Sequence, residues 1–427
     1  MGRTLVAAGP LAAQRRFGAL DGMRGCCAVM VAAYHLNPPG HSLLGPLLAH
    51  SYLWVDFFFV LSGFVIAHGY ADHIADGRQA GIFMVKRLAR IYPLHIAVLA
   101  VYVCLELTRS FTAGAHAAMA DHPPFTSWTS LPSLFANIGL VQGLGLFDVL
   151  TWNGPSWSIS CEFWTYGLFA LVLLSFAGRS VWAWAALATA ALMTLGLSQK
   201  PTMNIVDGLA IVRCAAGFFA GVLVQRAYRA FFATSLSTTW AGPGYSVLEW
   251  TAALATLAFV AFLGDGRVSL LAPVVFAGLV FILAMERGSL SRVLNTSLPA
   301  WLGRLSYPIY MVHALFVLLI LMAAKRVEAW TGISLTVPLV ENGVTNLVLS
   351  VRSPLAMDLM TVGFLVLTVG AAAALHLCIE EPARRLITAL VQPANRQRRS
   401  ARGDATQSIT ATLAGERAPT SRSAEAP

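Results

Sequence analysis

Residues 52–71 read YLWVDFFFVLSGFVIAHGYA, a continuous apolar run interrupted by one aspartate and one histidine. About 20 predominantly apolar residues in a helix cross the hydrocarbon core of a bilayer, so this stretch predicts a membrane-spanning helix. Over all 427 residues, 57% are hydrophobic and only 11% are charged, whereas a soluble globular protein is about 45–50% apolar and about 25% charged. The composition therefore excludes a soluble enzyme, a disordered regulator and a fibrous protein.

Further stretches of the same character predict an all-α fold, a polytopic membrane bundle of about ten transmembrane helices. The predicted spans are roughly 20–37, 52–71, 92–108, 160–176, 180–197, 209–228, 248–264, 268–285, 304–324 and 357–379. The region 134–150 is apolar but short and rich in glycine, and we interpret it as re-entrant or interfacial.

The distribution of positive charge predicts how the bundle is oriented. The chain carries 29 Lys and Arg against 20 Asp and Glu, a net charge of +9. When the N-terminus is placed in the cytoplasm, most of these basic residues fall on the inner side, as the positive-inside rule requires. We therefore expect both termini in the cytoplasm and a multi-pass protein of the cell membrane, the inner membrane of a bacterium.

The ends of the chain differ from the apolar body, and we expect the membrane domain to span residues 20–390. Residues 1–19 lack the compact apolar core of a cleavable signal and predict a cytoplasmic segment. Residues 391–427 contain almost no large apolar side chain and predict a disordered cytoplasmic tail. The six cysteines lie in or beside apolar stretches, so we expect neither a disulfide framework nor a metal site.

Ionisable residues inside the predicted spans are costly in lipid and are therefore candidate functional residues. Arg24 and His35 are 11 residues apart in one span, about 16 Å along a helix, which places Arg24 near the inner end and His35 near the outer end. Asp56 and Glu162 lie in the outer halves of their spans, at a depth similar to that of His35. A histidine with nearby carboxylates suits general-base chemistry, although a hydrogen-bonded packing role is the alternative. We interpret four further ionisable residues as structural: His68, His95, His376 and Arg213.

A basic cluster precedes the third predicted span, in the sequence KRLARIYP at 86–93. Helical spacing places Lys86 and Arg90 on one face, with Arg87 adjacent. Such a cluster can hold phosphate groups through charge-assisted hydrogen bonds. The alternative is that these residues only anchor the helix at the inner membrane surface.

Six motifs, in this order along the chain, resemble the acyltransferase-3 family of integral-membrane O-acyltransferases. They are LDGMRGCCAVMVAAYH (20–35), VDFFFVLSGFVI (55–66), KRLARIYP (86–93), WSISCEFWTYGLF (157–169), LSYPIYMVH (305–313) and IEEP (379–382). Each motif alone is a weak pattern, but the six together are specific and cover roughly residues 17–390.

The resemblance implies a bundle that transfers an acyl group, usually acetyl, from cytoplasmic acyl-CoA to a hydroxyl group of a saccharide, a glycolipid or another small acceptor. The essential histidine of the family corresponds to His35, its first-span arginine to Arg24 and its glutamate to Glu162. Its CoA-binding basic loop corresponds to Lys86, Arg87 and Arg90. Some relatives have arginine where this chain has Lys86, and lysine lacks the bidentate fork of arginine.

The expected mechanism makes His35 the general base, oriented by Glu162 or Asp56, with Arg24 beside the acyl-CoA. Direct transfer is our hypothesis, and an acyl-enzyme is the alternative. We expect the remaining candidates to contact the acceptor: Trp157, Trp164, Tyr166, Tyr310 and His313. For Tyr310 and His313, a structural role is the interpretation that we place ahead of a catalytic one. For the aromatic residues near the outer mouth, an interfacial belt is an equally open interpretation.

Two other classes of function remain open in the sequence. A transporter or exporter of a glycan or small solute also explains the spans and the intramembrane charges, but not the basic cluster together with His35. A membrane scaffold predicts that removal of His35 or Arg24 has no effect. We expect acyl-CoA, a hydroxyl acceptor and membrane lipid as partners, and no nucleic acid.

Overall fold

The computed structural model describes residues 16–36, 43, 45–116, 123–175, 180–199, 201–233, 242–341, 344–351 and 353–391. The predicted tail, 391–427, lies outside these residues except for its first position. Most of the predicted N-terminal segment, 1–19, lies outside them too.

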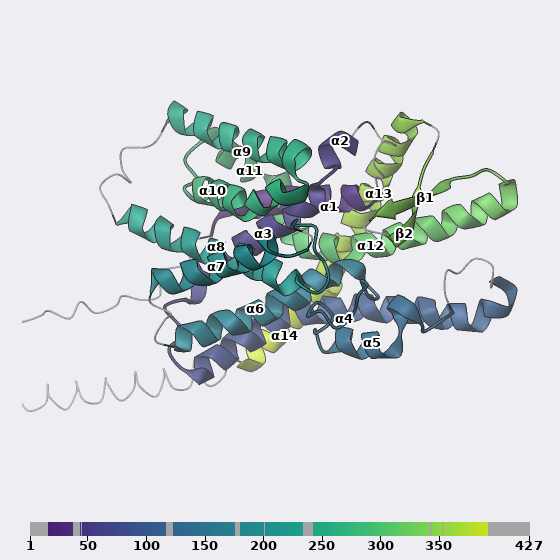
Figure 1. Ribbon diagram of the computed structural model, residues 1–427, viewed down its shortest axis with the longest axis horizontal. Helices are drawn as coiled ribbons and strands as arrows, with labels where there is room; N and C mark the ends of the chain where they lie inside the picture. Colours follow the sequence, from purple (N-terminus) through teal and green to yellow (C-terminus); the bar gives the residue numbers. More distant parts are fainter. Residues whose placement is uncertain are drawn as a thin grey trace, which may run out of the picture.

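The described chain is a bundle of long helices, and each predicted span corresponds to one of them (Figure 1). These helices are α1 (Gly18–Leu36), α3 (Trp54–Tyr70), α4 (Gly77–His116), α6 (Trp157–Leu174), α7 (Val181–Gly196), α8 (Ala210–Phe232), α9 (Pro243–Leu263), α10 (Ala272–Ala284), α12 (Ser297–Thr331) and α13 (Pro354–Leu375). Within the described residues, eight helical segments are long and apolar enough to cross a membrane. The charged α1 and the 16-residue α7 complete the predicted set. The all-α polytopic fold is confirmed.

Shorter elements connect the long helices. They are α2 (Gly45–Leu48), α5 (Leu131–Ile138), α11 (Ser289–Leu294), a π-helical turn (His376–Glu380), α14 (Glu381–Val391) and an antiparallel hairpin of β1 (Thr336–Glu341) and β2 (Val344–Leu349). The region interpreted as re-entrant or interfacial, 134–150, begins within α5, whose eight residues are too few to span a bilayer.

Helices α4 and α12 are longer than a bilayer requires. With 40 and 35 residues, they measure about 60 and about 52 Å, against about 30 Å of hydrocarbon. Both extend past the rest of the bundle at the same end, where the hairpin lies beside α12 (Figure 1). Glu328 of α12 fixes the hairpin by accepting hydrogen bonds from the backbone amides of Leu335 and Thr336, both at 2.6 Å.

Small residues allow α1 and α12 to approach closely, as is common between membrane helices. A Cβ atom added to Gly25 would lie 2.5 Å from the backbone nitrogen of Gly303. One added to Gly303 would lie 2.3 Å from the carbonyl oxygen of Asp21. This contact fixes how α1, which carries His35, lies against α12, which carries His313.

The two ends of the described chain meet at one face of the bundle. Arg16 and Asp21, near the start, line the same cavity as Arg384 and Arg385 in α14. A shared face is what an even number of spans produces. The assignment of that face to the cytoplasm remains a prediction from the charge distribution.

Candidate active site

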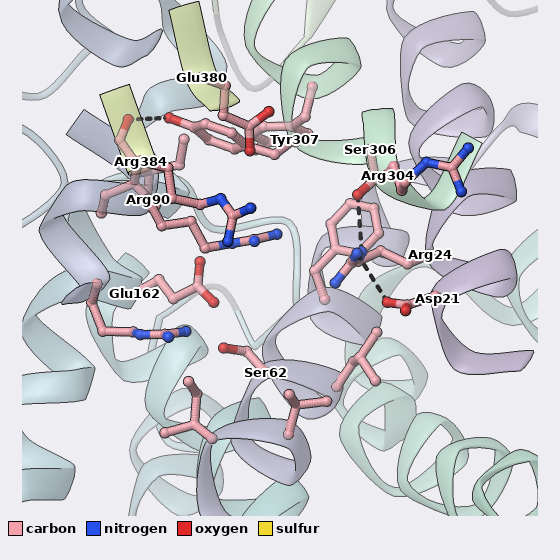
Figure 2. Close-up of a pocket in the computed structure, with 18 of the residues that line it drawn as sticks. Asp21, Arg24, Ser62, Arg90, Glu162, Arg304, Ser306, Tyr307, Glu380 and Arg384 are labelled. Atoms are coloured by element: carbon pink, nitrogen blue, oxygen red, sulfur yellow. Dashed lines mark hydrogen bonds and ion pairs between the residues drawn. The ribbon is translucent and has the colours of Figure 1, made fainter. Parts of the chain in front are cut away.

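A cavity of about 780 Å³ opens between α1, α3, α4, α6 and α12, with the π-helical turn and α14 at its rim (Figure 2). Its size falls within the usual range for small-molecule sites. The polar residues that line it are Arg16, Asp21, Arg24, Ser62, Arg87, Arg90, Ser158, Glu162, Tyr166, Arg304, Ser306, Tyr307, Tyr310, His376, Glu380, Glu381, Arg384 and Arg385.

The arginines of the cavity divide into neutralised and unpaired groups. Glu381 pairs with Arg384 at 2.5 Å and with Arg385 at 2.6 Å. Arg87 and Arg90, by contrast, make no ion pair with any described residue, although Arg87 donates to the hydroxyl of Tyr70 at 3.0 Å. These two guanidinium groups on one helix can therefore hold an anion such as a phosphate.

The predicted basic cluster is only partly present at the cavity. Arg87 and Arg90 line it, but Lys86 does not. The spacing allowed either pair of residues to share a face, because positions three and four apart are both neighbours on a helix. The packing of α4 turns Arg87 and Arg90 inward, so the lysine that departs from the family pattern is not part of this wall.

Arg24 lines the cavity and also joins α1 to α12. Its Nε donates to Oγ of Ser306 and its Nη2 to the carbonyl oxygen of Gly303, both at 2.9 Å. The same Nη2 lies 3.0 Å from a carboxylate oxygen of Asp21. Figure 2 shows Arg24 and Arg90 reaching into the cavity from opposite sides.

Glu162 lies on the wall of this cavity, in the part that faces Arg90 (Figure 2). The hydroxyl of Tyr166 donates to its Oε1 at 2.5 Å, and that hydroxyl lies 3.0 Å from Oγ of Ser62. Glu162 therefore does not form the expected hydrogen bond with His35. The shared depth of the two residues did not make them neighbours.

Asp56, the other expected partner of His35, is bound to Arg213 instead. Nε and Nη2 of Arg213 donate to the two carboxylate oxygens at 2.9 and 2.7 Å, and both side chains are almost completely buried. A buried carboxylate requires a counter-charge, and α8 supplies it. The hypothesis that Asp56 orients His35 is therefore wrong for this geometry, whereas the structural interpretation of Arg213 fits it.

His35 instead lies against a second histidine. The rings of His35 and His313 are 4.6 Å apart between centroids. Nδ1 of His35 lies 2.8 Å from the carbonyl oxygen of Val31, and Nδ1 of His313 lies 3.3 Å from that of Ile309. Because a carbonyl oxygen only accepts, each Nδ1 carries a hydrogen, and in the neutral ring each Nε2 keeps its lone pair. His35 is exposed, whereas His313 is fully buried and its Nε2 has no partner among the described residues.

Tyr310 connects the cavity to the histidine pair. Tyr310 lines the cavity, and its hydroxyl lies 2.8 Å from Oγ of Ser158 and 3.0 Å from the carbonyl oxygen of Pro155. Its ring centroid is 5.6 Å from that of His313. The cavity, Tyr310, His313 and His35 thus follow one another through the bundle.

The aromatic candidates of α6 have different positions. Tyr166 lines the cavity. Trp157 is buried and packs over the guanidinium of Arg213 at 5.3 Å. Trp164 is 42% exposed and donates from Nε1 to the carbonyl oxygen of Leu140. Neither tryptophan lines the cavity, so neither contacts what it holds in this arrangement.

Several cavity residues were not among the sequence candidates. They are Ser62, Ser158, Arg304, Tyr307, Glu380, Glu381, Arg384 and Arg385. Five of them lie within the quoted motifs, so the motifs could have indicated them: Ser62, Ser158, Tyr307, Glu380 and Glu381. The arginines of α14 have no such signal, because only the turn at His376–Glu380 brings that helix to the cavity.

Comparison with known proteins agrees with this architecture. The family described as "Acyltransferase domain" matches residues 17–378. "Protein 2 in picA locus" of Rhizobium radiobacter is 41% identical over 95 residues, which cover 21% of this chain and 48% of that protein. "Acyltransferase MdmB" of Streptomyces mycarofaciens is 29% identical over 168 residues, which cover 36% of this chain and 39% of that protein.

The chain thus spans less than half the length of each of these curated relatives. No solved structure matches it. The family match, however, extends over most of the chain and includes both histidines. It also includes the cavity residues other than Arg16, Glu380, Glu381, Arg384 and Arg385. This chain therefore belongs to the acyltransferase-3 family.

Proposed function

We propose that this protein is an O-acyltransferase that moves an acyl group, most simply acetyl, from cytoplasmic acyl-CoA to a hydroxyl of a saccharide, glycolipid or exopolysaccharide. The observation that carries the proposal is the alignment of an arginine-lined cavity at one end with an exposed histidine at the other. A phosphorylated donor fits the first environment, and a hydroxyl acceptor fits the second.

The donor would bind through its phosphate groups to Arg87 and Arg90, with Arg24 on the opposite wall. Its arm would extend past Glu162 towards Tyr310, so that the thioester approaches the histidine pair. Arg304 and His313 are nine residues apart on α12, about 14 Å along the helix. A donor bound at the rim must therefore reach deep into the bundle.

His35 would act as the general base through Nε2. As the acceptor oxygen bonds to the acyl carbon, Nε2 removes the hydroxyl proton, the carbon–sulfur bond breaks, and the thiolate of CoA then takes a proton. The hydrogen bond to the carbonyl oxygen of Val31 holds Nδ1 as the protonated nitrogen. This backbone contact replaces the carboxylate that the sequence led us to expect.

The decisive experiment is the His35→Ala variant in membranes with radiolabelled acetyl-CoA and surface glycan. Loss of a general base should lower transfer by about 10²- to 10⁴-fold at unchanged protein abundance. The matched control is His73→Ala, because His73 is exposed and lies outside the cavity. Transfer at the wild-type rate by His35→Ala would refute the assignment, and acylated protein formed without acceptor would refute direct transfer.

A further inference from the structure

Ser62, Tyr166 and Glu162 form a continuous hydrogen-bonded chain on the cavity wall. The carboxylate of Glu162 can only accept, so the single hydroxyl hydrogen of Tyr166 points to it over 2.5 Å. The hydroxyl of Tyr166 must then accept from Ser62, 3.0 Å away. This chain fixes the direction of every hydrogen in the group.

The consequence is a wall that offers only acceptors to the cavity. The one hydrogen of Ser62 is directed at Tyr166, so towards a ligand in the cavity Ser62 can only accept. Oε2 of Glu162 makes no hydrogen bond or ion pair with a described residue, and the half-buried side chain faces the cavity. Tyr166 itself is only 6% exposed and packs edge-on against Phe83 and Phe218, which holds the chain rigid.

This acceptor wall selects the chemistry of its ligand. A cationic amine is disfavoured, because Arg24, Arg87 and Arg90 line the same cavity and would repel it. An anion suits the arginines but not Glu162. What suits both is a ligand with phosphate at one end and neutral N–H groups farther along.

We infer that Ser62, Tyr166 and Glu162 form a subsite for the amide N–H groups in the arm of the acyl donor. The inference rests on the proposed function, since the pantetheine arm of acyl-CoA joins two amides to a phosphorylated nucleotide. The arginines hold the phosphates, and the chain orients the arm that carries the thioester. Glu162 is thus a donor-binding residue and not a partner of His35.

The test compares two ligands on the full-length protein in lipid nanodiscs, CoA and adenosine 3′,5′-bisphosphate, which lacks the arm. Glu162→Gln should bind CoA roughly tenfold more weakly, because an N–H group replaces an acceptor. The same variant should bind the bisphosphate as well as the wild type or more tightly, since a negative charge beside the arginines is gone. Ser62→Ala should weaken CoA binding by about fivefold and leave the bisphosphate unchanged.

Two controls make the outcomes separable. Arg90→Gln should weaken the binding of both ligands. Tyr245→Phe removes a hydroxyl on α9 outside the cavity and should leave the binding of both ligands unchanged. If Glu162→Gln strengthens the binding of CoA as much as it strengthens that of the bisphosphate, Glu162 is only a counter-charge to the arginines and the inference fails. If wild-type protein binds neither ligand, the proposed function fails instead.

Discussion

The pairs Arg213–Asp56 and Arg24–Asp21 both join an arginine to a carboxylate within the bundle, but their arginines differ in how many N–H donors remain free. Arg213 directs four of its five N–H donors at Asp56 and at the carbonyl oxygens of Ile205 and Tyr52, and it is about 1% exposed, so we call this pair saturated. Arg24 pairs with Asp21, is 26% exposed and keeps Nη1 without a hydrogen bond to a described residue. The saturated pair serves the fold, whereas the unsaturated one can serve a ligand.

The largest effect should come from breaking the saturated pair. Removal of one partner from a buried ion pair leaves an uncompensated charge and costs about 3–5 kcal/mol. Asp56→Ala should therefore lower the free energy of unfolding by about that amount, as measured by thermal unfolding in detergent. Little folded protein should remain in the membrane.

The matched control replaces both charges. Asp56→Leu combined with Arg213→Met removes the ion pair without leaving either charge alone, and such replacements are often neutral or stabilising. The double variant should recover most of the stability and should bind CoA normally. A double variant that folds but cannot bind CoA would place the pair in the site and break the comparison.

The next effect concerns the unpaired arginines of α4. Arg90→Gln removes charge-assisted hydrogen bonds of about 1.5–3 kcal/mol and should raise the KM for acetyl-CoA by about 10- to 100-fold. Thermal stability should not change, since Arg90 has no ion pair with a described residue to lose. Lys86→Gln is the matched control, and it should leave the KM unchanged. Equal effects of the two substitutions on the KM would support the interpretation from helical spacing, in which Lys86 and Arg90 bind the donor together.

The contrast between Lys86 and Arg90 also marks what the sequence can predict. The lengths of apolar runs located the spans because a bilayer imposes a fixed thickness. Helical spacing grouped the basic residues but could not determine the rotation of α4 about its axis. That rotation depends on packing against neighbouring helices, which no local pattern records.

Contacts between side chains on different helices could not be predicted from the sequence for the same reason. His35 and His313 are 278 positions apart, and their contact follows from the close approach of α1 and α12 at Gly25 and Gly303. Asp56 and Glu162 both looked like partners of His35, because depth was the only coordinate available. In the structure, Asp56 pairs with Arg213, and Glu162 accepts a hydrogen bond from Tyr166.

A smaller effect should follow from Arg24→Lys, which keeps the positive charge but removes the guanidinium group. Lysine cannot make the two directed hydrogen bonds to Ser306 and Gly303. Arg24→Lys should lower the free energy of unfolding by about 1–2 kcal/mol and reduce kcat more than it raises the KM, because the register of His35 against His313 is loosened. Ser306→Ala, which removes one of these bonds, should cost about 1 kcal/mol. An unchanged kcat in Arg24→Lys would show that the hydrogen bonds from Arg24 to α12 do not contribute to catalysis.

The smallest effect should come from a pair that is neither buried nor in the cavity. Arg229 and Asp72 lie 2.7 Å apart but are 36% and 61% exposed, and exposed pairs contribute about 0–1 kcal/mol because water screens them and the side chains lose entropy. Asp72→Asn should therefore change thermal stability by less than about 1 kcal/mol and leave acyl transfer intact. A larger loss would mean that short distance, and not burial and saturation, decides what an ion pair contributes. The stability contributed by the ion pairs of Asp56 and Asp21 would then also have to be ranked by distance.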